Sequence, residues 1–180
     1  MTPDDIKLHL EELYSYARPR IVNQLELDDV LTDTFTNALK AEGWTTESHK
    51  HDSAWLIGIL RKQIVAHYRK KYQSEEAIAN ARSITKETLE RPFELPEQLS
   101  NVDAELIGHS DGPSFWSAFN QCIEMLNPVH AEAFVLRDLE DVSVEEACGI
   151  FGLRRGDVLE LIYRARMMVI ACLVKNLESG

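Results

Sequence analysis

Apolar side chains recur every three or four positions along most of the 180-residue chain, and this is the spacing of amphipathic α-helices. In the first part of the chain the pattern predicts helices over residues 4–17, 27–42 and 54–73. No alternation of apolar and polar residues is long enough to indicate a β-strand. The sequence therefore predicts an all-α fold.

A second group of helices is predicted over residues 113–178. An apolar pattern breaks at Pro128, since the residue before a proline disfavours the helical conformation. Farther along, Ser143 and Glu146 have the spacing of a capping box, and Gly152 ends a helix of about eight residues. A longer helix begins after a turn of roughly three or four residues. A short helix, a glycine-containing turn and a second helix are typical of a helix-turn-helix.

The segment between these two groups has a different composition. Residues 76–112 contain two prolines, two glycines, many acidic groups and few large apolar side chains. A loop of this length inside one compact core is uncommon. We therefore predict two small helical domains, over residues 1–75 and 113–180, joined by a flexible linker over 76–112 with one short helix near 75–90.

The helix predicted over residues 54–73 is basic, although the chain as a whole is acidic. The net charge is −11, which opposes free, non-specific binding to nucleic acid. Residues 54–73, however, carry five Lys and Arg side chains and no Asp or Glu. Their basic groups gather opposite the apolar side chains, with Trp55 beside them. This helix is predicted to have one core face and one basic face.

Other classes of site are not indicated. Cys122, Cys148 and Cys172 are widely spaced and odd in number, so we predict small core cysteines without a disulfide framework or a metal knuckle, and leave a redox role open. His49 and His51 have no third ligand at a suitable spacing, so no metal site is predicted. No catalytic signature occurs, and the chain is predicted to be neither an enzyme nor a cofactor carrier.

Membrane insertion is not indicated either. No apolar run approaches the ~18 residues that a membrane span requires. The first twenty residues include Asp4, Asp5, Glu11 and Glu12 and lack the basic start and apolar centre of a signal peptide. We therefore predict a cytoplasmic protein.

Three stretches of the sequence carry a family resemblance. LDDVLTDTFTNALK (27–40) resembles the polymerase-clamp-binding helix of bacterial RNA polymerase sigma factors of the extracytoplasmic-function (ECF) group. AWLIGILRKQIVAHYRKK (54–71) resembles the helix of that family that meets the minus-ten promoter element. Residues 126–169 resemble its helix-turn-helix, which meets the minus-thirty-five element. Two motif blocks in the right order make the resemblance specific.

The resemblance implies a function and partners. It implies a sigma region 2-like bundle in residues 1–75, a sigma region 4-like helix-turn-helix in 113–180, and promoter-specific transcription initiation with core RNA polymerase. It also implies a cognate anti-sigma factor that holds the protein inactive. The loop 43–53 corresponds to the segment that captures a flipped promoter base.

The resemblance and the charge pattern together assign site residues. DNA contacts at the minus-ten element are predicted for Trp55, Arg61, Lys62, His67, Arg69, Lys70, Lys71 and Tyr72, whose aromatic members would bind unpaired bases. DNA contacts by the helix-turn-helix are predicted for Arg154, Arg155, Asp157, Arg164 and Arg166. Polymerase contacts are predicted for Asp28, Asp29 and Asp33.

One departure from the family keeps alternatives open. Where the family has a polar and basic run in its recognition helix, this chain has Asp157-Val-Leu-Glu-Leu161. Acidic groups there oppose phosphates, although a carboxylate can accept from a cytosine amino group. One alternative is a sigma mimic that titrates an anti-sigma factor without initiating transcription. The other is an ordinary helix-turn-helix regulator that uses only residues 113–178.

Overall fold

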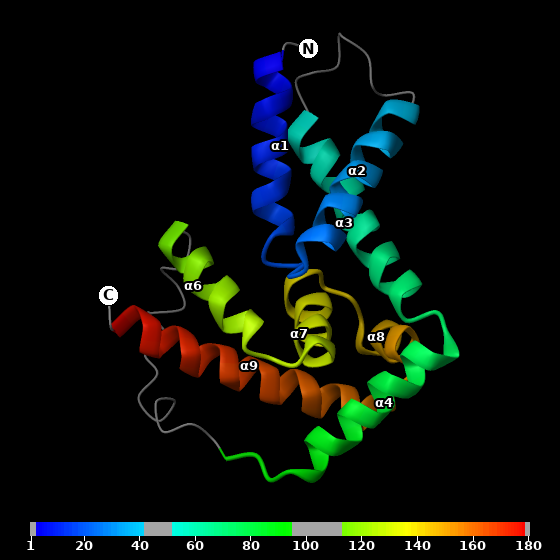
Figure 1. Ribbon diagram of the computed structural model, residues 1–180, viewed down its shortest axis with the longest axis vertical. Coiled ribbons are helices and arrows are strands. Elements are labelled where there is room, and N and C mark those ends of the chain that lie inside the picture. The colour runs from blue at the N-terminus through cyan, green and yellow to red at the C-terminus, as the bar shows by residue number, and fades with distance from the viewer. Residues whose placement is uncertain (1–2, 42–51, 95–112, 179–180) are drawn as a thin grey trace. The chain divides into compact units, whose positions relative to one another are not determined.

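The computed structural model describes residues 3–41, 52–94 and 113–178, which fall into two compact units, Met1–Lys71 and Tyr72–Gly180 (Figure 1). Within these described ranges the regular elements are helices and no strand occurs, so the predicted all-α class is confirmed. None of the helices there is long and apolar enough to cross a membrane.

The first unit consists of three helices. They are α1 (Pro3–Ala17), α2 (Gln24–Lys40) and α3 (Asp52–Lys71). Helix α3 packs against both of the others (Figure 1). Its predicted apolar face is its buried face, because Leu56, Leu60 and Ile64 have no exposed surface. The 3.6-residue period of the sequence thus fixes which side of α3 remains outside.

Two side chains near helix ends of this unit have environments that helical periodicity does not predict. Leu39, near the end of α2, is 64% exposed although it is a large apolar residue. Ser53 lies within α3, and its hydroxyl donates to Glu12 and contacts His9 instead of capping the helix. A tertiary partner therefore takes the hydroxyl that a cap would have used.

The second unit contains the remaining elements. They are α4 (Glu75–Glu90), α6 (Pro113–Glu124), α7 (Pro128–Phe134), the π-helical segment η3 (Val135–Leu139), α8 (Val144–Phe151) and α9 (Arg155–Glu178). Its core includes Phe119, Ile123, Phe134, Ala165 and Val169, which come from α6, α7 and α9. Burial of these large apolar groups provides the main stabilisation of the unit.

The predicted helix-turn-helix is present as α8, a short turn and α9. Ser143 caps α8, and its hydroxyl accepts from the backbone N–H of Glu146 at 3.1 Å. Gly152 ends the helix with φ 64°, a left-handed conformation that glycine adopts without steric cost. The predicted start and stop signals of α8 are confirmed.

The short helix predicted near residues 75–90 is confirmed. Residues 75–90 form a four-turn helix, α4, that packs against α7, α8 and α9, with Ala81 and Thr85 buried. The boundary between the units falls after Lys71, four residues earlier than predicted. Residues 95–112 and most of the loop 43–53, with His49 and His51, lie outside the described residues.

The prediction for the cysteines is also corrected. Cys122 of α6 and Cys172 of α9 form a disulfide across a sequence separation of 50 residues. Cys148 of α8 is a free, half-buried thiol whose pKa is raised by burial and by Glu145. The sequence showed the number of cysteines but not the antiparallel approach of α6 and α9 that pairs two of them.

The disulfide gives a testable prediction for stability. Replacing Cys122 and Cys172 by Ser should lower the free energy of unfolding of the second unit by about 2–4 kcal/mol, because the unfolded chain gains conformational freedom. Urea denaturation under non-reducing conditions measures this change. Cys148→Ser is the matched control and should leave the free energy within about 0.5 kcal/mol. Equal stability of the double variant and the parent would contradict a disulfide in the folded protein.

Candidate nucleic-acid interface

The outer side of α3 carries exposed basic side chains. Arg61, Lys62, Arg69 and Lys70 are exposed, whereas Leu60 and Ile64 of the same helix are fully buried. Arg61 and Lys62 lie mid-helix, and Arg69 and Lys70 lie in its last turn. The structure thus presents four of the eight predicted minus-ten residues to solvent on one helix. Trp55, near the start of α3, is half-buried.

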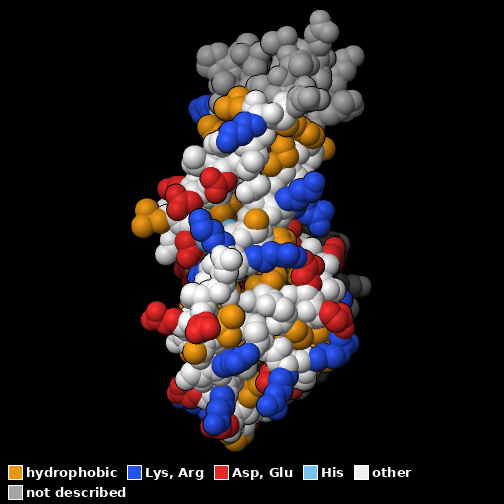
Figure 2. All heavy atoms as spheres, turned by 90° about the vertical axis from the view of Figure 1, so that its right-hand side faces the viewer, with side chains coloured by type: hydrophobic (Ala, Val, Ile, Leu, Met, Phe, Trp, Pro, Cys, Tyr) orange, Lys and Arg blue, Asp and Glu red, His pale blue; other side chains and the backbone are white. Residues whose placement is uncertain are grey.

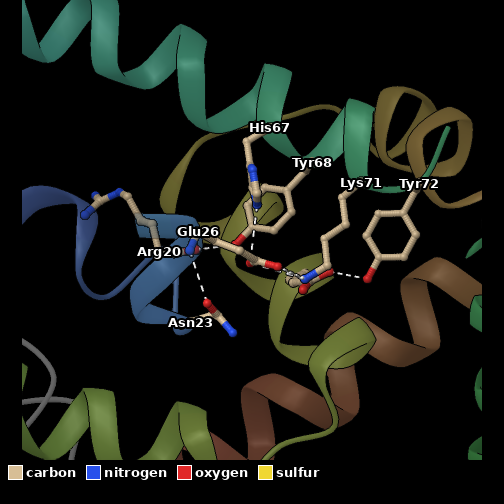
Figure 3. Close-up of polar contacts among 8 residues, drawn as sticks. Arg20, Asn23, Glu26, His67, Tyr68, Lys71 and Tyr72 are labelled. Carbon is tan, nitrogen blue, oxygen red and sulfur yellow. Dashed lines mark hydrogen bonds and ion pairs between the residues drawn. The ribbon is translucent and has the colours of Figure 1, made fainter. Parts of the chain in front are cut away.

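His67 and Lys71 are directed toward α2 (Figure 3). Nε2 of His67 lies 3.3 Å from Oε2 of Glu26, and Nζ of Lys71 lies 3.1 Å from Oε1 of the same carboxylate. The backbone N–H of Glu26 donates in turn to the side chain of Asn23, which caps α2. These two predicted DNA contacts therefore join α3 to the first turn of α2.

Tyr72, which was predicted to contact DNA at the minus-ten element, is almost completely buried. It belongs to the second unit and is only 7% exposed. Its hydroxyl donates to the buried carboxylate of Glu132, and its ring makes an edge contact with Phe151 at a centroid distance of 4.8 Å. A side chain held in this way does not present its ring to an unpaired base, so we withdraw Tyr72 from the predicted interface.

The predicted polymerase residues lie on the exposed side of α2. Asp29 and Asp33 line a groove between α2 and α3 whose other wall includes His67, Lys70 and Lys71. Acidic and basic groups thus face each other across this groove. Asp28, one position before Asp29, is also exposed and accepts from the side chain of Gln24 at 2.8 Å.

Three of the four predicted helix-turn-helix arginines are engaged within the second unit. Arg166 makes a two-bond contact with the carboxylate of Asp138, at 2.7 and 2.8 Å, and this contact raises the pKa of Arg166. Arg155 pairs with Glu145.

Arg164 is the most enclosed of these arginines. Its side chain is 13% exposed and bonds to Glu160 at 2.9 Å and to two backbone carbonyls at the end of α4. These arginines therefore stabilise the fold, and their partners could not be predicted from the sequence.

Arg154 and Asp157 lie in a groove that the sequence analysis missed. The opposite wall is α4, which contributes Arg82 and Lys86 among other residues. Arg154 is exposed at the start of α9 and Asp157 is half-buried. On the face drawn in Figure 2, basic side chains are interspersed with acidic ones and form no continuous patch. The helix-turn-helix thus offers a local cation at its turn rather than a broad positive surface.

His130 is a buried titratable group close to this region. Its Nε2 is buried and has no hydrogen-bond partner among the described residues. Burial, and secondly the positive charge of Arg164, lower the pKa of His130 below its ordinary value of 6.5. The residue is neutral in the folded protein at neutral pH. In the part of the chain that the structure describes, no group of three metal-ligating side chains occurs.

Comparison with known families matches both units. The model for Sigma-70 region 2 matches residues 6–73, which contain most of α1 and all of α2 and α3. The model for Sigma-70, region 4 matches residues 117–169, which contain the helix-turn-helix. Both regions therefore occur in the predicted order, and α4 lies between the two matches.

Individual relatives agree with these matches. A probable RNA polymerase sigma factor of Haemophilus influenzae is 27% identical over 166 residues, which cover 87% of this chain and 81% of that protein. The ECF RNA polymerase sigma factor BldN of Streptomyces coelicolor is 26% identical over 86% of this chain and 53% of its own length. The RNA polymerase sigma factor YlaC of Bacillus subtilis is 24% identical over 98% of this chain and 94% of its own. No solved structure matches the chain significantly.

The buried His130 predicts acid sensitivity of the second unit. A lowered pKa means that the unfolded chain takes up a proton first as the pH falls through 6.5, so stability is complete above this pH and decreases below it. The loss approaches about 1.4 kcal/mol per pH unit until the folded state also binds the proton. Urea denaturation of the wild type and His130→Gln at several pH values isolates the contribution. Parallel pH profiles would show that His130 is not the responsible group.

Proposed function

Because the chain belongs to the ECF group of the sigma-70 family of RNA polymerase sigma factors, we propose that its two units divide promoter recognition between them. A sigma factor binds core RNA polymerase and directs initiation at a promoter. The first unit meets the minus-ten element, and the second meets the minus-thirty-five element. The protein acts in the cytoplasm, where it reaches both polymerase and DNA.

The basic side of α3 is the observation that carries this assignment. Arg61, Lys62, Arg69 and Lys70 are exposed on a helix whose opposite side is fully buried. Phosphate contacts by such groups position a protein on DNA and depend strongly on salt. The net charge of −11 weakens binding outside the polymerase complex, so these cations act where the complex places them.

In the second unit, the turn and the start of α9 are the parts proposed to approach the minus-thirty-five element. A helix-turn-helix contacts base edges with the first residues of its second helix. Arg154 and Asp157 occupy that position, and Asp157 suits a cytosine amino group as acceptor. Leu159 and Tyr163 are each 44% exposed on α9, and Leu159 suits contact with a thymine methyl group.

Helix α2 is the proposed protein-binding surface. Asp28, Asp29 and Asp33 are exposed there, together with Leu25 at 77% and Leu39 at 64% exposure. Large exposed apolar side chains among charges are typical of a protein interface. We assign this surface to the polymerase clamp. A cognate anti-sigma factor that covered the same surface would silence the protein by competition.

The basic side of α3 can be tested by charge reversal. Arg61→Glu combined with Lys62→Glu should reduce promoter-specific initiation in vitro by about tenfold or more, because two phosphate contacts become repulsive. Binding to core polymerase should remain largely unchanged. The same change of charge at Lys7 and Lys175, on α1 and α9, is the matched control. Initiation at the parent level in the first variant would refute the placement of the DNA on α3.

The acidic side of α2 has a separate test. Asp29→Ala combined with Asp33→Ala should weaken binding to core polymerase by about three- to tenfold, chiefly through slower association. Titration of labelled protein with core enzyme measures the affinity. Removal of two exposed acids of α1, Asp4→Ala with Glu11→Ala, provides the control at equal net charge. An equal loss in both double variants would indicate a net-charge effect and overturn the assignment to α2.

A further inference from the structure

Helix α4 packs directly on the turn of the helix-turn-helix. Nε of Arg82 donates to the backbone carbonyl of Gly152 at 2.8 Å. The side chain of Ile78 lies so close to the same glycine that a Cβ at that position would be 2.7 Å from its Cγ2. The glycine therefore serves the turn through its left-handed φ and also leaves the space that Ile78 occupies.

The far end of α4 is held by α9. One guanidinium nitrogen of Arg164 donates to the carbonyls of Thr88 and Arg91, each at 2.9 Å. These carbonyls lie at the C-terminus of α4, where a helix lacks internal donors and attracts positive charge. Phe93 contacts Tyr163 of α9 at a centroid distance of 6.0 Å and lies 5.4 Å from the Arg164 guanidinium.

The chain just before α4 is held as well. Tyr72 donates to Glu132 and packs against Phe151, the last residue of α8. The whole stretch from Tyr72 to Phe93 is therefore attached to the helix-turn-helix unit. Since Lys71 and Tyr72 are consecutive residues, only one peptide bond, about 3.8 Å between Cα atoms, separates the last residue of α3 from that unit. Residues 95–112 then connect α4 and α6 of the same unit and add no reach between the units.

With α4 docked, the connection between the units is too short for them to contact the minus-ten and minus-thirty-five elements at the same time. Positions −10 and −35 are about 25 base pairs apart, or roughly 85 Å of DNA at 3.4 Å per pair. The 20-residue α3 is about 30 Å long. A unit of roughly 100 residues, with a radius of gyration near 13 Å, adds about 35 Å. Even end to end, these lengths fall short of the two elements.

Release of α4 supplies the missing length. The 16 residues of α4 would span about 24 Å as a free helix. The 22 residues from 91 to 112 would add up to about 73 Å when extended. From this connectivity, and given the proposed function, we propose that the α4 contact is a closed state of the protein. The chain leaves this state when it occupies both promoter elements.

The same contact also restricts the recognition helix. Arg154 and Asp157 line the groove that α4 covers on one side, and Arg164 is occupied by the α4 carbonyls. Release of α4 frees Arg164 and opens the start of α9 to DNA. The docking of α4 thus limits both the distance that the two units can span and the access of α9 to DNA.

A reversible crosslink tests the closed state. Ile78→Cys with Gly152→Cys, in a Cys148→Ser background, places two thiols where the structure has direct contact. With oxidised glutathione the engineered pair should crosslink readily in the free protein. In the complex with polymerase and promoter DNA it should crosslink at least about tenfold more slowly, because α4 has left the turn. Equal crosslinking rates in the two states would overturn the proposal.

Initiation by the crosslinked protein gives the second readout. The crosslinked form should bind core polymerase but lose promoter-specific initiation, and reductant should restore it. The Cys148→Ser parent, with and without reductant, controls for reduction of the Cys122–Cys172 disulfide. Failure of the parent to initiate would count against the proposed function itself. Full initiation by the crosslinked form would count only against the closed state.

A second variant leaves Gly152 unchanged, because a side chain at this left-handed position can prevent folding. Ile78→Asp should release α4 and raise the apparent promoter affinity of the polymerase complex by about three- to tenfold. Ala79→Asp, which adds the same charge on the exposed side of α4, should leave the affinity unchanged. Equal affinity of the Ile78→Asp and Ala79→Asp complexes would overturn the proposal.

Discussion

The hydrogen bonds of Arg164 to the end of α4 are the constraint on which the second unit depends. A guanidinium that is 13% exposed needs acceptors, because leaving such a charge without partners costs several kcal/mol. Glu160 supplies one acceptor, and the carbonyls of Thr88 and Arg91 supply the others. Phosphate oxygens satisfy the same donors equally well. In the closed state that we propose, docking of α4 and binding of DNA compete for Arg164, so the helix α4 controls the DNA contacts of the helix-turn-helix.

The distribution of charge follows from a related requirement. A chain with a net charge of −11 is repelled by DNA at long range, and ions screen this repulsion beyond about 10 Å. Cations that lie against phosphate still bind. Arg61 and Lys62 on α3 are exposed and are the cations that we propose for phosphate contact, whereas Lys71 pairs with Glu26 and Arg166 pairs with Asp138. Selective contact inside the polymerase complex, rather than free affinity for DNA, is the result.

The sequence was informative wherever structure depends on neighbours along one helix. The buried face of α3 followed from its period, and the ends of α8 followed from Ser143 and Gly152. It was misleading wherever a residue's partner is distant in the chain. Tyr72 pairs with Glu132 across 60 residues, and Arg164 with Thr88 across 76. The short helix predicted near residues 75–90 is present as α4, but composition does not reveal that this helix docks on other elements. The acidic and basic faces were predictable; the internal partners of the arginines were not.

The free energy of α4 docking determines how strongly the protein discriminates between promoters. Only Ala81 and Thr85 of α4 are fully buried, and its outer side, including Glu76 and Glu87, faces solvent. A three- to tenfold rise in affinity on release of α4 corresponds to a closed state that is more stable by about 0.7–1.4 kcal/mol. Every 1.4 kcal/mol of that stabilisation lowers the apparent affinity for DNA about tenfold. A promoter with a weak minus-thirty-five element offers too little binding energy to displace α4. Promoters that match both elements overcome it, so the closed state sharpens the discrimination between them.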